Sequence, residues 1–262
     1  MNFVLKIIAL IVFLIIFIII MKYLFKDASK LQNGIQDGKT QSTVSSGSLT
    51  TDGISSSSNN FTYSVWFYVS DWNYRYGEPK VIFGRMGSKS PLQGGSIRGM
   101  SGGDPCPIVF LGGLENNVSV GLACYPGVDS IAENPNNKGS VIHTCTVQNV
   151  PIQKWVNLLI SVYGRTLDVY IDGKLVKTCL LPGISKINQN ADIQITPTGG
   201  FDGWTTKLQY WAHSLNPQEA WDIYVKGFND KGLLGSYVSP DYSMKVSVTN
   251  NSDNSTNEYS IL

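Results

Sequence analysis

The sequence predicts an all-β protein: a two-sheet antiparallel sandwich with one short helix, preceded by a single transmembrane α-helix. Three observations lead to this fold class. No polar side chain interrupts the chain from Ile7 to Met21. Further on, short segments with apolar residues at alternate positions recur between Gly, Pro and Asn, as in sandwiches and barrels. Aromatic residues make up 11% of the chain and charged residues only 15%, a composition that suits strands and turns.

The apolar run is long enough to cross a bilayer, which takes about 20 apolar residues. A cleaved signal peptide is the alternative, but its apolar region is usually about 7–15 residues and ends at a small-x-small site. Here the run continues into MKYLFKD, and Ala28 is the first small residue after it. We therefore expect residues 1–27 to form an uncleaved membrane anchor. The side chains expected in the membrane or at its surface are Ile7, Leu10, Phe13, Phe17, Ile20 and Lys22.

Two signals bear on which side of the membrane the remaining chain lies. Lys22, Lys26 and Lys30 follow the apolar run, and basic residues near a span favour the cytosolic side. Four N-x-S/T sequons would be glycosylated in a lumen, but several are expected by chance in a chain rich in Asn, Ser and Thr. We expect the large C-terminal part to face the cytosol. The sequons begin at Asn60, Asn117, Asn250 and Asn254.

Residues 28–59 are dominated by Gly and Ser and show no apolar periodicity, which predicts a flexible linker with a root-mean-square reach of roughly 30 Å. An added edge strand at residues 48–54 is the alternative for this stretch. Residues 60–235 form the expected domain. Residues 236–262 are polar and poor in core-forming side chains, so we expect a tail that orders only on a partner.

Within the domain, the alternation of Phe61, Tyr63, Val65, Phe67 and Val69 with smaller or polar residues predicts the first strand. Asp-Gly at 172–173, between two apolar segments, predicts a type I′ hairpin. One helix is expected at 217–226, with an Asn N-cap, Pro at its first position and Gly after its end. Further strands are expected at 80–85, 107–111, 118–124, 141–147, 155–163, 167–171, 175–181, 193–196 and 205–213.

The four cysteines allow three pairings, between which spacing does not choose. Cys106 and Cys124 flank an expected hairpin and could bridge; alternatively, each cysteine is a small buried side chain. No CxxC or Cys/His spacing predicts a zinc site, and we expect no metal or other cofactor. The formal net charge of +1 gives no electrostatic basis for binding nucleic acid. The remaining two cysteines are Cys145 and Cys179.

Three segments together resemble the concanavalin-A-like, laminin-G-like domain family. They are FTYSVWFYVSDW, QKWVNLLISVYGRTLDVYIDGKLVKTCLLPG and FDGWTTKLQYWAHSLNPQEAWDIYVKG, which cover about 150 residues in the family's order. The resemblance implies a jelly roll of two antiparallel sheets. It also implies core-facing positions for four tryptophans: Trp66, Trp155, Trp211 and Trp221.

A narrower resemblance is carried by the segment DWNYRYGEPKVIFGR. It resembles a variant of this domain found in membrane-anchored virion proteins of large double-stranded DNA viruses, whose virions enclose an internal membrane beneath a capsid shell. The resemblance implies a minor capsid or membrane protein whose domain faces the capsid.

Catalysis is not expected, although the same fold hosts glucanases. Those enzymes need two carboxyl groups about 5–10 Å apart, and no Glu here has another acidic residue within four positions on an expected strand. His143 and His213 lack a neighbourhood that resembles a catalytic triad. Asp104 and Asp202 are single oxygen ligands in loops, whereas calcium takes six to eight ligands.

Laminin-G-like domains often bind glycans through rim loops, and the loop after the first strand has suitable residues. Trp72, Tyr74 and Tyr76 could stack on sugar faces, and Asn73 could bond hydroxyl groups. The alternative is that Trp72 and Tyr74 plug one end of the sandwich. The long Gly-rich loop 88–105, which contains Arg98, is expected to dock on a neighbouring protein surface.

The leading hypothesis is therefore a non-enzymatic, membrane-anchored adaptor, most specifically a viral minor capsid protein that links an internal membrane to the capsid shell. Its expected partners are the membrane, which it spans once, and other capsid or membrane proteins. The alternative is a membrane-tethered lectin on a virion or cell surface, with the 72–76 loop and Arg98 as glycan contacts. A degenerate glycosidase is a third, weaker hypothesis.

Overall fold

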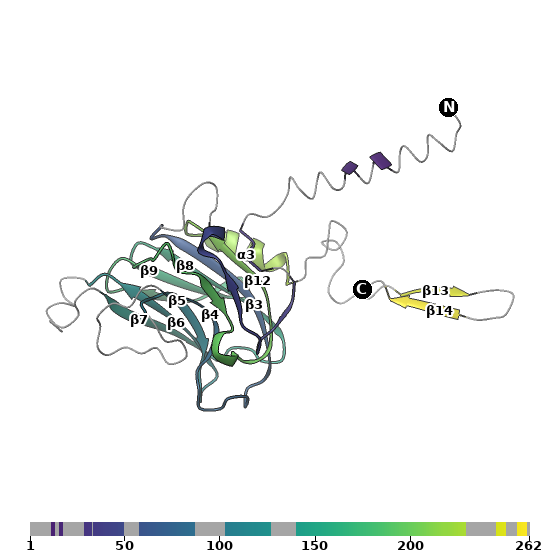
Figure 1. The fold of residues 1–262 in the computed structure, drawn as a ribbon, viewed down its shortest axis with the longest axis horizontal. Coiled ribbons are helices and arrows are strands. Elements are labelled where there is room, and N and C mark those ends of the chain that lie inside the picture. The colour runs from purple at the N-terminus through teal and green to yellow at the C-terminus, as the bar shows by residue number, and fades with distance from the viewer. Residues whose placement is uncertain are drawn as a thin grey trace.

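The structure is a computed structural model that describes most of the domain (Figure 1). It describes residues 12–13, 16–17, 29–32, 34–49, 58–86, 103–126, 140–228, 245–249 and 256–260. Most of the expected anchor lies outside these residues; residues 12–13 and 16–17 are helical, with Phe13 and Phe17 exposed. Within the described ranges, no helix has the length and apolar character needed to cross a membrane.

The described core of the chain is a jelly-roll-like sandwich of two six-stranded antiparallel sheets (Figure 1), as the sequence predicts. Sheet A has the order β1 (Gln36–Asp37), β12 (Asp202–Trp211), β3 (Phe61–Asp71), β8 (Trp155–Tyr163), β9 (Thr166–Ile171) and β10 (Lys174–Leu180). Sheet B has the order β2 (Ser42–Val44), β11 (Ile193–Ile195), β4 (Lys80–Met86), β5 (Pro105–Leu111), β6 (Asn117–Cys124) and β7 (Val141–Gln148).

The two ends of the sandwich are defined by the register of the central strands. At one end, Phe61 pairs with Val162, and Ser29 lies beside the last residues of β12; we call this the Ser29 end. At the other end, Tyr68 pairs with Trp155 and β3 runs on to Asp71; we call this the Trp72 end. At about 3.3 Å per residue, the nine residues of β8 separate the two ends by roughly 30 Å.

The core between the sheets follows the alternation that the sequence shows. Phe61, Tyr63, Val65, Phe67 and Val69 all point inward and are at most 1% exposed. Because side chains alternate between the faces of a strand, the intervening residues of β3 point to the outer face of sheet A. Apolar residues of sheet B complete the core from the opposite side: Ile82, Phe83, Val109, Leu111, Val118, Val120 and Leu122.

The expectation that four tryptophans face the core between the sheets is wrong. Trp66 is buried, but on the outer face of sheet A, where its ring stacks 5.7 Å from that of Tyr224 in the helix. Trp155 and Trp211 are half-buried and Trp221 is 42% exposed. The helix α3 (Pro217–Val225) covers this outer face and supplies a second, smaller apolar cluster. A sequence pattern gives the period of a strand but not which of its two filled faces is inside.

The helix and the predicted hairpin form as expected. Asn216 accepts a hydrogen bond from the backbone of Glu219, whose carboxylate accepts one in return from the Asn216 N–H, so the helix starts with a capping box. Asp172 and Gly173 both have positive φ, 50° and 72°, as a type I′ turn requires. In the expected polar tail, β13 (Lys245–Thr249) and β14 (Thr256–Ser260) pair as a hairpin, which the composition did not indicate.

Residues 29–32 and 34–49 are not a flexible linker in the structure. Tyr210 N donates to Ser29 O at 2.8 Å, Leu31 N donates to Leu208 O at 2.8 Å and Gly38 N donates to Gly203 O at 2.7 Å. This segment therefore extends sheet A along β12, and β2 then extends sheet B along β11. Of the edge strand considered at residues 48–54, residues 50–54 lie outside the described residues. Besides the backbone pairing, apolar contacts hold this segment: Leu31 and Val44 pack against the core and Leu49 is fully buried. These apolar residues are too far apart in the sequence to give a periodicity.

The cysteines pair differently from the bridge considered for Cys106 and Cys124, which are both buried and form no disulfide. The disulfide instead joins Cys145 of β7 to Cys179 of β10. These two strands are the last strands of their sheets on the same side of the sandwich. The disulfide therefore links sheet A to sheet B where no backbone ladder does.

Candidate partner-binding site

The loop that follows β3 is held in place by its own polar groups and by the loop at residues 197–200. Asp71 Oδ1 accepts from the Asn73 N–H at 2.9 Å, and the Tyr74 hydroxyl donates to Gly199 O at 3.1 Å. Arg75 donates to Glu78 Oε2 and to Thr198 O. The loop is thus a fixed part of the Trp72 end.

The aromatic residues proposed for glycan contact do not share one exposed face. Trp72 is half-buried and packs against the main core, as the plug alternative predicts. The Tyr74 ring lies under the Lys39 ammonium group, with Nζ 4.8 Å from its centroid. Tyr76 is 62% exposed and Asn73 is also exposed. In this loop, Asn73 and Tyr76 therefore remain for direct contact with a partner.

Arg98 and most of the Gly-rich loop lie outside the described residues. The strands that flank this loop show where its two connections are. β4 ends at Met86 and β5 begins at Pro105, and these residues pair at the Ser29 end. The loop therefore leaves and rejoins the sandwich at the end opposite to Trp72.

Lys80 lies buried at the Trp72 end, a position that sequence reasoning did not single out. The side chain is 0% exposed, and Nζ lies 4.8 Å from the centroid of the Trp72 ring. Among the residues that the structure describes, Nζ has no hydrogen-bond partner. Burial lowers the pKa of Lys80 from its ordinary value, and the charge of Arg75 lowers it further, against a smaller opposite effect of Asp71 and Glu78.

We expect Lys80→Met to raise the free energy of unfolding at pH 7, because it keeps the stem and removes a charge that burial destabilises. The lowered folded-state pKa means that wild-type stability rises as pH increases towards the ordinary lysine value of 10.5. The stability difference between the two proteins should therefore shrink as the pH rises from 7 towards 10.5. Urea unfolding across this interval measures it, and a difference independent of pH would contradict the assignment.

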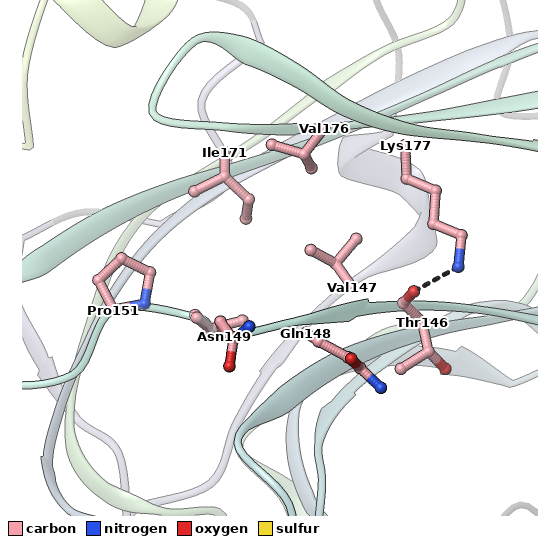
Figure 2. A pocket seen from close by; sticks show the side chains of 9 residues that line it. Thr146, Val147, Gln148, Asn149, Pro151, Ile171, Val176 and Lys177 are labelled. Carbon is pink, nitrogen blue, oxygen red and sulfur yellow. Dashed lines mark hydrogen bonds between the residues drawn. The ribbon is translucent and has the colours of Figure 1, made fainter.

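An open cleft of about 670 Å³ lies between the free edges of the two sheets, near the Trp72 end (Figure 2). Figure 2 shows Val147 of β7 facing Ile171 and Val176 across the opening, which gives the cleft an apolar lining. Lys177 Nζ donates to Thr146 O at 2.7 Å and spans the gap beside them. The other lining residues are Gln148, Asn149, Val150 and Pro151.

The edge of β7 at this cleft carries few of the features that protect edge strands. All eight of its residues pair with β6 in continuous register, and it contains neither Pro nor Lys. By contrast, β10 carries Lys174 and Lys177 and a register shift after Leu175, which are features that oppose strand addition. The cleft can thus accept apolar side chains between the sheets, while β7 offers backbone groups for an extended segment.

The described residues contain no candidate metal site. No group of three or more His, Cys, Asp or Glu residues there could hold a metal ion. Asp104 lies 2.8 Å from both the Lys186 ammonium group and the Ser140 hydroxyl, at a smaller cleft of about 340 Å³. Asp202 pairs with Lys39 at 3.2 Å. The two aspartates considered for calcium therefore have separate protein partners.

No family model and no curated protein matches the chain. Among solved structures, the binding domain of botulinum neurotoxin serotype G is similar over 74% of this chain and 41% of that chain, with 17% identity and a TM-score of 0.46. The receptor binding domain of the botulinum neurotoxin C/D mosaic serotype is similar over 74% and 45%, with 12% identity and a TM-score of 0.49. The chain thus spans less than half of each of these domains, and we draw no functional conclusion from likenesses of this size.

Proposed function

We propose that the chain is a non-enzymatic, membrane-anchored adaptor. Residues 1–27 hold it in a bilayer, and the Trp72 end together with the cleft beside Val147 binds a protein partner. One observation carries the proposal: the segment that follows the anchor is fixed at one end of the sandwich, and the cleft lies towards the other. The two attachments are therefore roughly 30 Å apart, along the length of the strands.

The ordered segment makes the connection to the membrane short. Seven residues, 22–28, separate the apolar run from Ser29, and they reach at most about 25 Å. A flexible linker of residues 28–59 would instead let the domain move freely above the membrane. The connection is short and continues into strands at the edges of both sheets. It therefore limits the distance between the bilayer and the end that binds the partner, as an adaptor requires.

The more specific form of the proposal is a viral minor capsid protein that links an internal membrane to the capsid shell. Its support is the resemblance of DWNYRYGEPKVIFGR to such virion proteins. In this form the domain lies on the cytosolic, capsid-facing side, as Lys22, Lys26 and Lys30 favour. We then expect Asn60 and Asn117 to be unmodified in the native protein.

Alkaline carbonate extraction of native membranes tests the anchor. We expect the full-length chain to stay in the membrane pellet, because an apolar helix of about 20 residues does not leave the bilayer when peripheral contacts are broken. A variant that lacks residues 1–21 is the matched control and should be released. Release of the full-length chain into the supernatant would show that it is not anchored.

The lectin alternative is tested through Tyr76, the exposed aromatic residue of the loop at residues 72–78 that follows β3, which we call the tip loop. Trp72 is unsuitable for this purpose, because it packs against the core and its loss would destabilise the domain. Glycan-array binding that disappears in Tyr76→Ala but persists in the control Tyr163→Ala, at the opposite end, would favour the lectin. The adaptor proposal predicts no glycan binding that depends on Tyr76.

A further inference from the structure

Four large apolar side chains are exposed together at the Ser29 end of the sandwich. Tyr163 is 68% exposed, Leu180 69%, Tyr125 51% and Ile184 48%. They come from the ends of β8 and β10, from the residue after β6 and from the segment that crosses between the sheets. We call these four residues the apolar rim.

Backbone contacts bring the members of the apolar rim to one place. Tyr163 and Leu180 both pair with Thr166 at the start of β9. The Tyr125 N–H donates to Ile184 O at 2.8 Å, and the Leu181 N–H donates to Arg165 O at 2.8 Å. The apolar rim therefore consists of one pair at the end of sheet A and one pair beside sheet B, and residues 181–183 connect the two pairs.

Two basic side chains lie at the same end as the apolar rim. Arg165 is exposed in the turn beside Tyr163, and the backbone of Lys30 pairs with that of Gln209. At the Trp72 end, basic and acidic side chains form ion pairs: Lys39 with Asp202, Arg75 with Glu78 and Lys154 with Asp172.

We propose that the apolar rim rests in the headgroup region of the bilayer that holds the anchor, with Lys30 and Arg165 directed to lipid phosphates. Tyrosine and basic side chains prefer this region, because one part of each is apolar and the other is hydrated. The anchor brings the surface there: Ser29 lies at the same end as the apolar rim, and residues 22–28 reach at most about 25 Å from the span.

This inference rests on the proposed anchor and adds to it the orientation of the domain. The Ser29 end of the sandwich faces the lipid, so the cleft and the tip loop point away from the membrane. The alternative is that a second copy of the chain or another protein binds the apolar rim, and the test distinguishes this from contact with the bilayer.

Two full-length variants, Tyr163→Cys and Tyr76→Cys, form a matched pair for the test. Both replace a tyrosine with similar exposure, 68% and 62%, at opposite ends of the sandwich. The native cysteines outside the disulfide, Cys106 and Cys124, are buried, so a thiol-reactive fluorophore attaches at the introduced cysteine. Each labelled chain is reconstituted in phosphatidylcholine vesicles that contain phosphatidylserine and a nitroxide on a fraction of the headgroups, and flotation confirms attachment.

We expect the label at position 163 to be quenched by the headgroup nitroxide at least about threefold more strongly than the label at position 76, since interfacial groups insert about 5–10 Å. Equal quenching in floating vesicles would overturn the inference and leave the anchor intact. Protection of the position 163 label from aqueous iodide without nitroxide quenching would assign the apolar rim to a protein, and would also overturn it. Failure of either chain to float would overturn the anchor and the inference together.

Discussion

Loss of the disulfide between Cys145 and Cys179 is expected to lower the free energy of unfolding by about 4 kcal/mol. The bridge closes a loop over a sequence separation of 34 residues, which limits the entropy of the unfolded chain. It also ties β7 to β10, the free edges on one side of the sandwich. The double variant Cys145→Ala/Cys179→Ala measures the effect in urea unfolding.

Cys124→Ala is the matched control, because Cys124 is equally buried but has no disulfide partner. It should cost about 1 kcal/mol, the usual effect of losing a small buried group. Reductant should destabilise the wild type and the control by similar amounts and leave the double variant unchanged. A double variant as stable as the control would mean that the bridge does not constrain the chain.

Gly200→Ala is expected to lower the free energy of unfolding by about 3 kcal/mol and to loosen the N-terminal segment. The φ angle of Gly200 is +39°, which L side chains rarely adopt, and an added Cβ would lie 2.1 Å from Gly38 O. Gly38 O accepts from the Phe201 N–H at 3.1 Å, where the segment joins sheet A. The methyl group would therefore push this segment away from β12.

Hydrogen exchange locates the effect of Gly200→Ala beyond overall stability. The amides of Leu31 and Gly38, which bond to β12, should lose protection before those of β3 and β8. Gly47→Ala is the control, because the nearest atom to its added Cβ is 3.8 Å away, and a change within about 0.5 kcal/mol is expected. Uniform loss of protection through both sheets would show that the segment is not separately attached.

The strands of the sandwich could be predicted because burial on one or both faces leaves a period of two in the sequence. Phe61 to Val69 show this period, and the Asp172-Gly173 turn identifies its hairpin by the conformation that it requires. The choice between inner and outer faces was not predictable in β3. Both faces are filled with aromatic side chains there, and helix α3, distant in sequence, covers the outer one.

The N-terminal strands and the disulfide could not be predicted, for two different reasons. Residues 36–37 and 42–44 join the sheets through backbone hydrogen bonds, which any side chain permits. The partner of Cys145 depends on how the free edges of two sheets meet, and spacing along the chain does not encode this. Both features bear on function. The N-terminal strands shorten the membrane connection, and the disulfide joins the two sheets beside the cleft.

The candidate site was only partly predictable. The aromatic loop at 72–76 does lie at one end of the sandwich, but Trp72 serves the core and Tyr76 faces solvent. Residues of both sheets line the cleft, among them Val147, Ile171 and Val176. No local sequence pattern predicts such a cleft. Lys80 could have been noticed as a charge at the start of a strand whose next three residues, Val81 to Phe83, are apolar.

Partition of the protein between shell and membrane tests the adaptor most directly. If the chain belongs to a virion with an internal membrane, two treatments of purified particles separate its attachments. Removing lipid with a nonionic detergent should leave the protein with the capsid shell, whereas stripping the shell should leave it with the membrane. A protein that follows lipid in both treatments and never remains with shell components would contradict the account.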